Sequence, residues 1–302
     1  MKRLTAVALL GAVLLSGIGM SQEMPRGISR ELHDRALNIL REVLKDGKEW
    51  VKIHAGESLV WTGHPEGVYE TFVKELDGAG PSYRIGVWRV LAQAARDEKE
   101  RQQYTQKVLD AFLDVKGPDR LHAAETLGKL GYAGKEPELI RVCEEETGSF
   151  QACARWVRAN SGDEDSGDEE DETKLAALLD SDDPDARGCA GYALRFFKTI
   201  GPATFAKLAA AAQREPETSS QRANLLSPWY LHASSEARPA IKARLVGYAD
   251  HGTKDDKREM CAALGRVPDP ADIPLFTRLL DDAELDVRAG AAEALLRIQK
   301  TH

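Results

Sequence analysis

The chain has 302 residues, of which 42% are hydrophobic and 30% are charged, with 41 basic and 49 acidic side chains. These proportions, with many stretches rich in Ala, Leu, Arg and Glu, are typical of amphipathic helices in a globular protein. Eight of the acidic residues lie between positions 163 and 172, and the rest of the chain is nearly neutral. Since basic residues are not in excess, we expect no nucleic acid partner.

The first 21 residues have the layout of a secretory signal peptide. Lys2 and Arg3 precede an apolar run over residues 4–18, and residues 19–21 offer a cleavage site. Because this run is shorter than the roughly 20 residues of a membrane-spanning helix, a cleaved signal is favoured over a retained anchor. No later segment is apolar enough to span a membrane. We therefore expect a mature chain of residues 22–302 that is periplasmic or secreted and not inserted in a membrane.

The rest of the sequence repeats one short pattern about eight times. A basic anchor residue is followed by small residues three and four positions later and usually by Leu at the seventh, as in Arg288, Ala291, Ala292 and Leu295. The copies are 30 to 37 residues apart, which is the period of two-helix solenoid repeats. Pro and Gly separate the apolar stripes, so each copy predicts a helix, a turn and a second helix. The anchor positions are Lys52, Arg84, Arg120, Phe150, Arg187, Arg222, Lys257 and Arg288.

These copies resemble HEAT-like repeats, in particular the short bacterial form known from phycobilisome-lyase-like proteins. The resemblance is clearest over residues 279–295, weaker over 178–187, and covers most of 28–302. It implies an all-α fold, an α-solenoid whose second helices line a concave face. It does not imply lyase activity, because such repeats occur in proteins of many functions. Residues 50–72 also look like HEAT-type extracytoplasmic regions associated with bacterial sodium:solute symporters, which would make a membrane transporter a partner.

The helical period assigns faces to the second helix of each copy. Positions three, four and seven after the anchor share one side and are predicted to be core, and positions two, five and nine lie opposite. In the first three copies these opposite positions combine polar and aromatic side chains, which predicts a binding strip on the concave face. The alternative is a solvated surface with scattered aromatic residues. The predicted strip consists of His54, Glu57, Trp61, Arg89, Gln93, His122, Glu125 and Lys129.

Two consequences follow for this strip. The eighth copy has only Gly290, Glu293 and Arg297 at the same positions, and we do not expect it to contribute. Because strip residues should face solvent, replacing Trp61 or Arg89 by Ala should cost at most about 1 kcal/mol of stability.

Two pairs within the strip, His54 with Glu57 and His122 with Glu125, have the spacing of metal ligands on one helix face. Di-iron hydroxylases built from HEAT-like repeats use His and Glu on inward helices. Their motif places His directly beside Glu, which differs from the spacing here. Helices pack about 8–10 Å apart, which would separate the first and third repeats by roughly 20 Å. We expect no metal, and without a nucleotide-binding loop or a nucleophile motif we expect no cofactor.

An acidic run at residues 161–172 separates the fourth and fifth copies. Like charges repel and stay solvated, so a flexible loop is predicted. The run departs from the EF-hand pattern, because counting from Asp163 finds Asp168 in place of Gly and Lys174 in place of Glu. Weak calcium binding is left open by this comparison. Replacing the whole run by a short Gly/Ser linker should change the thermal stability little.

Four cysteines in a secreted chain invite pairing. Cys143 and Cys153 lie five residues on either side of Gly148, so a helical hairpin that turns there would bring them to equal height. We predict a disulfide between them. Cys189 and Cys261 belong to the fifth and seventh copies and are expected to be free thiols. The alternative for all four is a role as small buried apolar side chains.

Together these features predict a noncatalytic, secreted or periplasmic scaffold that holds a protein, peptide or glycan against the concave strip. The alternative is an enzyme, lyase-like or metal-dependent, that uses a groove lined by His and Glu. Contact between a histidine and a carboxylate across neighbouring second helices would favour the enzyme. An open and shallow aromatic surface would favour the scaffold.

Overall fold

Helices form every regular element in the part of the chain that the computed structural model describes, residues 27–160 and 169–300. None of the helices in these two ranges combines the length and the apolar character needed to cross a membrane. The fold is an all-α solenoid of HEAT-like helix pairs, as the repeat pattern predicts. The predicted signal peptide, residues 1–21, lies outside the described residues and stays a prediction.

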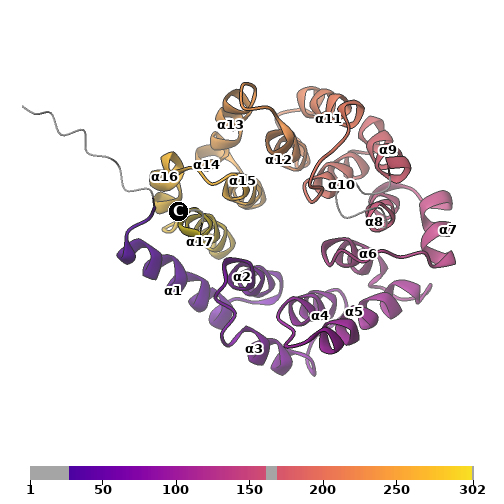
Figure 1. Cartoon of the computed structure of the whole chain (residues 1–302), viewed down its shortest axis with the longest axis horizontal. Coiled ribbons are helices and arrows are strands. Elements are labelled where there is room, and N and C mark those ends of the chain that lie inside the picture. The colour runs from indigo at the N-terminus through magenta and orange to yellow at the C-terminus, as the bar shows by residue number, and fades with distance from the viewer. Residues whose placement is uncertain (1–26, 161–168, 301–302) are drawn as a thin grey trace, which may run out of the picture.

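The described residues form eight helix pairs, each with an outer and an inner helix (Figure 1). Every anchor position lies in an inner helix, so the order and number of repeats are confirmed. The pairs are α1 (Arg30–Asp46) with α2 (Glu49–Thr62), α3 (Val68–Glu75) with α4 (Tyr83–Gln93), α5 (Glu98–Leu113) with α6 (Arg120–Lys129), α7 (Pro137–Glu145) with α8 (Gly148–Ala159), α9 (Glu169–Ala177) and η1 (Leu178–Asp180) with α10 (Pro184–Leu194), α11 (Pro202–Arg214) with α12 (Arg222–His232), α13 (Arg238–Val246) and α14 (Tyr248–His251) with α15 (Lys254–Arg266), and η2 (Pro270–Asp272) and α16 (Ile273–Leu279) with α17 (Leu285–Lys300).

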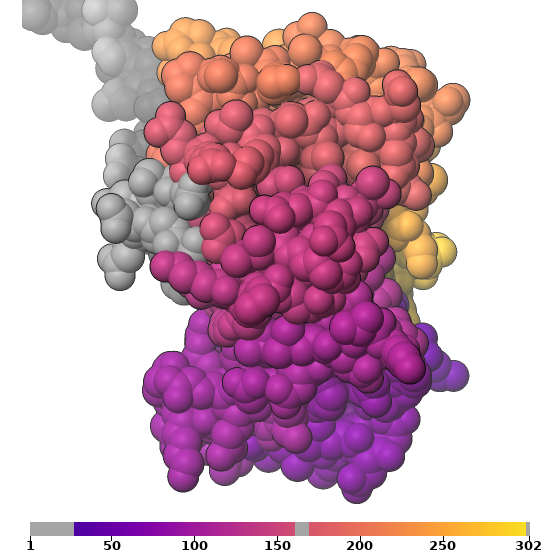
Figure 2. Space-filling model, turned by 90° about the vertical axis from the view of Figure 1, so that its right-hand side faces the viewer, coloured from indigo at the N-terminus to yellow at the C-terminus, as the bar shows by residue number. Residues whose placement is uncertain are grey.

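The two ends of the solenoid meet, so the helix pairs form a closed ring (Figure 1). The last inner helix, α17, packs against both α1 and α2. In Figure 2 the yellow C-terminal residues accordingly lie beside the indigo N-terminal ones. One hydrophobic core runs through this junction and includes Ala36 and Leu40 of α1 together with Ala291 and Leu295 of α17. The predicted concave face is therefore the enclosed centre of a ring and not an open surface.

Small residues on the inner helices explain the tight curvature. A Cβ atom on Gly128 of α6 would lie 2.5 Å from Cδ2 of Trp156 in α8, and one on Gly191 of α10 would lie 2.8 Å from the carbonyl oxygen of Asn224 in α12. Neighbouring inner helices thus approach more closely than any side chain at these positions would allow. The outer helices are spread over a wider circle (Figure 1), and this difference in spacing bends the array.

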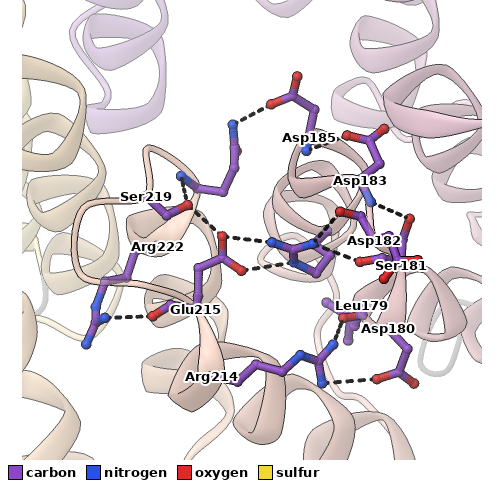
Figure 3. Close-up of polar contacts among 12 residues, drawn as sticks. Leu179, Asp180, Ser181, Asp182, Asp183, Asp185, Arg214, Glu215, Ser219 and Arg222 are labelled. Atoms are coloured by element: carbon purple, nitrogen blue, oxygen red, sulfur yellow. Dashed lines mark hydrogen bonds and ion pairs between the residues drawn. The ribbon is translucent and has the colours of Figure 1, made fainter.

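In five of the eight repeats the anchor residue binds a carboxylate of the following repeat. Lys52 of α2 binds Glu75 of α3 at 2.6 Å. Arg187 of α10 binds both carboxylate oxygens of Glu215, at 2.9 and 3.1 Å, and also donates to the carbonyl of Ser181. Figure 3 shows Glu215 and Ser181 within this network of polar contacts. The most regular feature of the sequence therefore serves the architecture, and the functional residues must be sought elsewhere.

The end of the predicted acidic loop is helical. Residues 169–172 form the first turn of α9, where acidic side chains are stabilised by the helix dipole. Asp171 is 5% exposed and lies 3.2 Å from Nε of Arg158 and 3.7 Å from Nη1 of Arg155. The prediction of a flexible loop is therefore wrong for these four residues. Residues 161–168, and with them the question of calcium, lie outside the described part of the chain.

Asp171→Ala should lower the free energy of unfolding by about 2 kcal/mol, because it removes a buried carboxylate that contacts two arginines. Glu169→Ala is the matched control. Its side chain is exposed in the same helical turn, so the free energy should change by less than about 0.5 kcal/mol. Urea denaturation followed by circular dichroism measures both values. Equal losses of unfolding free energy in Asp171→Ala and Glu169→Ala would contradict the docking of α9 against α8.

Candidate functional site

The positions predicted to form the binding strip face two adjoining cavities at the centre of the ring. The larger has a volume of about 420 Å³ and lies at the N-terminal ends of the inner helices, where Trp50, Leu121 and Ser149 line it. The smaller has a volume of about 30 Å³, enough for about two water molecules. The side chains that line both cavities are His54, Lys129, Tyr192 and Arg258.

Seven of the eight predicted strip residues line these cavities. Glu57 and Trp61 border the smaller one, Arg89, His122 and Glu125 border the larger one, and His54 and Lys129 border both. Gln93 borders neither cavity and donates a hydrogen bond to Glu57 at 3.2 Å.

Two of the strip residues form a buried ion pair. Arg89 donates to both carboxylate oxygens of Glu57, at 2.7 and 3.0 Å, and also to Thr126 at 3.1 Å. Glu57 and Arg89 are each 1% exposed. Burial alone would raise the pKa of Glu57, but the charges of Arg89 and Lys129 outweigh it and hold that pKa at about 2. The expectation that Arg89 faces solvent is therefore wrong, because closure of the ring removes this face from water.

Side chains of inner helices two repeats apart are in contact at the centre of the ring. The His122 ring in the third repeat stacks on Trp50 in the first, with ring centroids 5.4 Å apart. Lys129 in the third repeat lies 5.3 Å from the ring centroid of Tyr192 in the fifth. The estimate of 20 Å between the first and third repeats assumes a straight array. Curvature shortens that distance on the inner side.

A histidine and a carboxylate are in contact where the ring closes. Nδ1 of His54 on α2 lies 2.9 Å from Oδ1 of Asp286 on α17, and Nε of Arg258 lies 3.5 Å from the other oxygen of Asp286. Burial would raise the pKa of Asp286, but the hydrogen bond from His54 and the charge of Arg258 lower it, so the carboxylate is ionised. A carboxylate anion only accepts hydrogen bonds, which places the proton of His54 on Nδ1.

The other nitrogen of His54 is available to a ligand. Burial, followed by the charge of Arg258, lowers the pKa of His54, so the ring is neutral at physiological pH. Among the described residues, none makes a hydrogen bond to Nε2. The side chain lines both cavities. His54 therefore presents an unprotonated nitrogen at the centre of the ring.

Two arginines of the C-terminal repeats, Arg266 and Arg297, line the smaller cavity although neither was assigned to the predicted strip. Arg266 forms no ion pair with any described residue; it donates to the carbonyl of Arg195 at 2.6 Å and lies 4.5 Å from the Phe196 ring centroid. Burial and the charges of Arg195 and Arg297 lower the pKa of Arg266 to about 10. Arg266 and Arg297 occupy the ninth position after their anchors, as Trp61 does, so the helical register contains the signal. The predicted strip was restricted to the first three repeats, because the eighth copy has only Gly290, Glu293 and Arg297 at these positions.

The predicted disulfide between Cys143 and Cys153 does not form, and all four cysteines are free. Sγ of Cys153 instead lies 3.2 Å from Sγ of Cys189 on α10. Equal height in a helical hairpin does not fix the direction of a side chain. Cys153 stands three positions after its anchor, and that position faces the next inner helix.

The two predicted His and Glu pairs have other partners. Glu57 binds Arg89, and Glu125 binds Lys129 at 2.7 Å. Over residues 27–160 and 169–300, no group of three or more His, Cys, Asp or Glu side chains is placed to hold a metal ion.

No family model matches the chain. A regulatory protein RecX of Chlorobium limicola is 39% identical over 80 residues, which are 26% of this chain and 48% of RecX. The chain thus spans about half the length of this curated relative. Among solved structures, human deoxyhypusine hydroxylase in complex with glycerol is 18% identical with a TM-score of 0.41, over 90% of this chain and 98% of the hydroxylase. An engineered protein is 16% identical with a TM-score of 0.33, over 89% and 83% of the two chains.

Closure of the ring corrects the prediction of a noncatalytic binding scaffold with an open concave strip. The predicted strip is enclosed and its charges are paired, so it is not an open and shallow aromatic surface. The contact between His54 and Asp286 joins two neighbouring inner helices, which is the arrangement expected of the enzyme.

Arg89→Met should lower the free energy of unfolding by about 3–5 kcal/mol, because Glu57 would stay buried without its guanidinium partner. The double variant Glu57→Leu/Arg89→Met should recover most of this loss, since it removes both charges. Arg30→Met is the control, because that side chain is 96% exposed, and it should cost less than about 0.5 kcal/mol. Chemical denaturation measures all three. A loss below about 1 kcal/mol for Arg89→Met would restore the solvent-facing assignment.

The free energy of unfolding should decrease as the pH drops below 6.5, the ordinary pKa of histidine. The pKa of His54 is lowered in the folded state, so the unfolded chain binds the proton first and is favoured. His54→Gln should therefore reduce the loss of unfolding free energy between about pH 7 and pH 5. His251→Gln removes an exposed histidine and should leave the loss as it is in the wild type. If the free energy of unfolding of His54→Gln falls with pH as steeply as that of the wild type, His54 does not contribute to this pH dependence.

Proposed function

We propose that the chain is an enzyme whose reaction takes place at the centre of the ring, with His54 as a general base acting on a small polar substrate. The observation that carries this proposal is the hydrogen bond of 2.9 Å between Asp286, on the wall of the smaller cavity, and His54, which lines both cavities. This is the enzyme alternative derived from the sequence, with the carboxylate supplied by the eighth repeat.

In this proposal His54 accepts the proton and Asp286 orients the imidazole ring. Asp286 holds the imidazole by its Nδ1 proton, so the lone pair of Nε2 points away from the carboxylate and can accept a proton from a substrate or a water molecule. The positive charge that then forms on the ring is stabilised by the ionised carboxylate. Arg258, 3.5 Å from Asp286, keeps that carboxylate ionised and opposes permanent protonation of His54.

The larger cavity determines the size and chemistry of the substrate. Its volume of about 420 Å³ suits a small molecule. Asn224 and the stacked rings of Trp50 and His122 border it, while Lys129 and Arg258 lie where it adjoins the smaller cavity. Lys129 and Arg258 donate hydrogen bonds only. A substrate with a carbonyl, carboxylate or phosphate group directed at these two side chains fits this arrangement.

We also infer that the repeats are of the short bacterial HEAT-like type known from phycobilisome-lyase-like proteins. The anchor residue supports this assignment, because in Lys257 it binds Asp282 of the following repeat at 2.8 Å. The assignment names a type of repeat and no activity. Extracytoplasmic location and a transporter partner stay predictions from the sequence.

Diethyl pyrocarbonate tests whether His54 is an accessible neutral base, because it modifies unprotonated imidazole nitrogens. At about pH 7, where a histidine of lowered pKa is unprotonated, we expect modification of His54 by mass spectrometry. Cleavage at Trp61 by chymotrypsin separates His54 from His64. The exposed His251 serves as the positive control. Modification of His251 without His54 would contradict the proposal.

Hydrolysis of p-nitrophenyl acetate tests the same base in a reaction, since an activated ester reports any accessible basic imidazole. His54→Gln should remove most of the protein-catalysed rate and leave only the contribution of exposed histidines such as His251. Asp286→Asn should lower it as well while leaving a folded protein, checked by circular dichroism. His64→Gln, which changes a loop histidine outside both cavities, is the matched control. Equal rates for wild type and His54→Gln would overturn the assignment of His54 as the base.

A further inference from the structure

Two cysteines from successive repeats meet at the wall of the larger cavity. Sγ of Cys153 on α8 lies 3.2 Å from Sγ of Cys189 on α10. Both side chains line the cavity, but Cys153 is only 2% exposed and Cys189 is partly exposed. Cys189 also lies within 3.5 Å of the carbonyl oxygen of Ser149, to which its thiol donates. One sulfur is therefore reachable from the cavity and the other lies behind it.

The geometry suits a bond between these sulfurs. A disulfide requires the sulfurs to be about 2 Å apart, so each needs to move by only a fraction of an ångström or so. The helices α8 and α10 pack directly against each other. Neither sulfur has a metal ligand set around it among the described residues. Among the described residues, no hydrogen bond joins the side chain of Cys143 or Cys261 to this pair.

We propose that Cys153 and Cys189 are a redox-active dithiol that is oxidised reversibly by a small-molecule disulfide entering the larger cavity. The thiolate of Cys189 attacks one sulfur of the small disulfide, which forms a mixed disulfide and releases the first small thiolate. The thiolate of Cys153 then attacks Sγ of Cys189, which forms the protein disulfide and releases the second small thiolate. The two protons of the cysteines protonate the two released thiolates, and the small disulfide accepts the two electrons.

Burial and contacts assign the order of the two steps. The hydrogen bond with Cys189, followed by burial, raises the pKa of Cys153 well above the ordinary value of a thiol. Cys153 therefore stays protonated while the pair is reduced. Once Cys189 has formed the mixed disulfide, the sulfur that Cys153 must attack is already its neighbour. Cys189 reacts first and Cys153 resolves the intermediate.

The linkage can be identified by treating the reduced protein with oxidised glutathione and digesting it without reduction. Trypsin leaves Cys143 and Cys153 in one peptide, because no Lys or Arg lies between Arg141 and Arg155. Cleavage after Glu144, Glu145 and Glu146 then separates the two cysteines. We expect a crosslink between Cys153 and Cys189, with Cys143 and Cys261 titrating as free thiols after denaturation. Four free thiols, or a crosslink between Cys143 and Cys153, would overturn the proposal.

Single variants test the order of reaction. Cys153→Ser should accumulate a mixed disulfide between glutathione and Cys189, since the resolving thiol is absent. Cys189→Ser should leave Cys153 unmodified in the folded protein and allow its modification in urea. Cys143→Ser is the matched control, and it should form the crosslink at the wild-type rate. Glutathione on Cys153 of folded Cys189→Ser at the wild-type rate would contradict the assigned order. Because none of these variants alters His54 or Asp286, the result is independent of the proposed general base.

Discussion

Closure of the ring is the constraint on which the rest of the structure depends. Apart from the walls of the two cavities, it removes the inner face of the solenoid from water, and that face carries many charged side chains. Buried charges are tolerated only when they are paired and hydrogen-bonded. Glu57 and Arg89 satisfy each other. Arg195 and Glu259 form a second buried ion pair, in which Nε of Arg195 and Oε1 of Glu259 have no hydrogen-bond partner among the described residues. The polar interior is thus a consequence of the closed geometry, and its few incompletely satisfied groups mark the places where a ligand can act.

His54, Arg266 and Cys189 are three such groups. His54 has one nitrogen engaged and one free, Arg266 has no carboxylate partner among the described residues, and Cys189 presents its sulfur to a cavity. They come from the first, seventh and fifth repeats, so no single repeat carries the candidate chemistry. The ring assembles it from segments far apart in the sequence, as folds commonly do when a common architecture hosts a particular site.

The repeat pattern was sufficient to predict the fold and the inward-facing positions. Ala123, Ala124 and Leu127 are buried where the register places them, and Glu57, Glu125 and Arg297 share the opposite face. Closure could not be predicted, because curvature depends on small differences in helix spacing such as the approach of Gly191 to Asn224. The pairing of His54 with Asp286 depends on closure of the ring, so it could not be predicted from the sequence either. The direction of Cys153 depends on which neighbouring helix its position faces, which spacing along the chain does not reveal.

An open solenoid grows or shrinks by whole repeats, because each repeat contacts only its neighbours and the end repeats need separate capping surfaces. In this protein the first and last repeats cap each other through α1, α2 and α17. Eight repeats complete one full turn, so each turns the chain by about 45° on average. Inserting or deleting one repeat would leave the ends overlapping or apart and would separate His54 from Asp286. The number of repeats is therefore fixed by geometry, and the candidate active site exists only at that number.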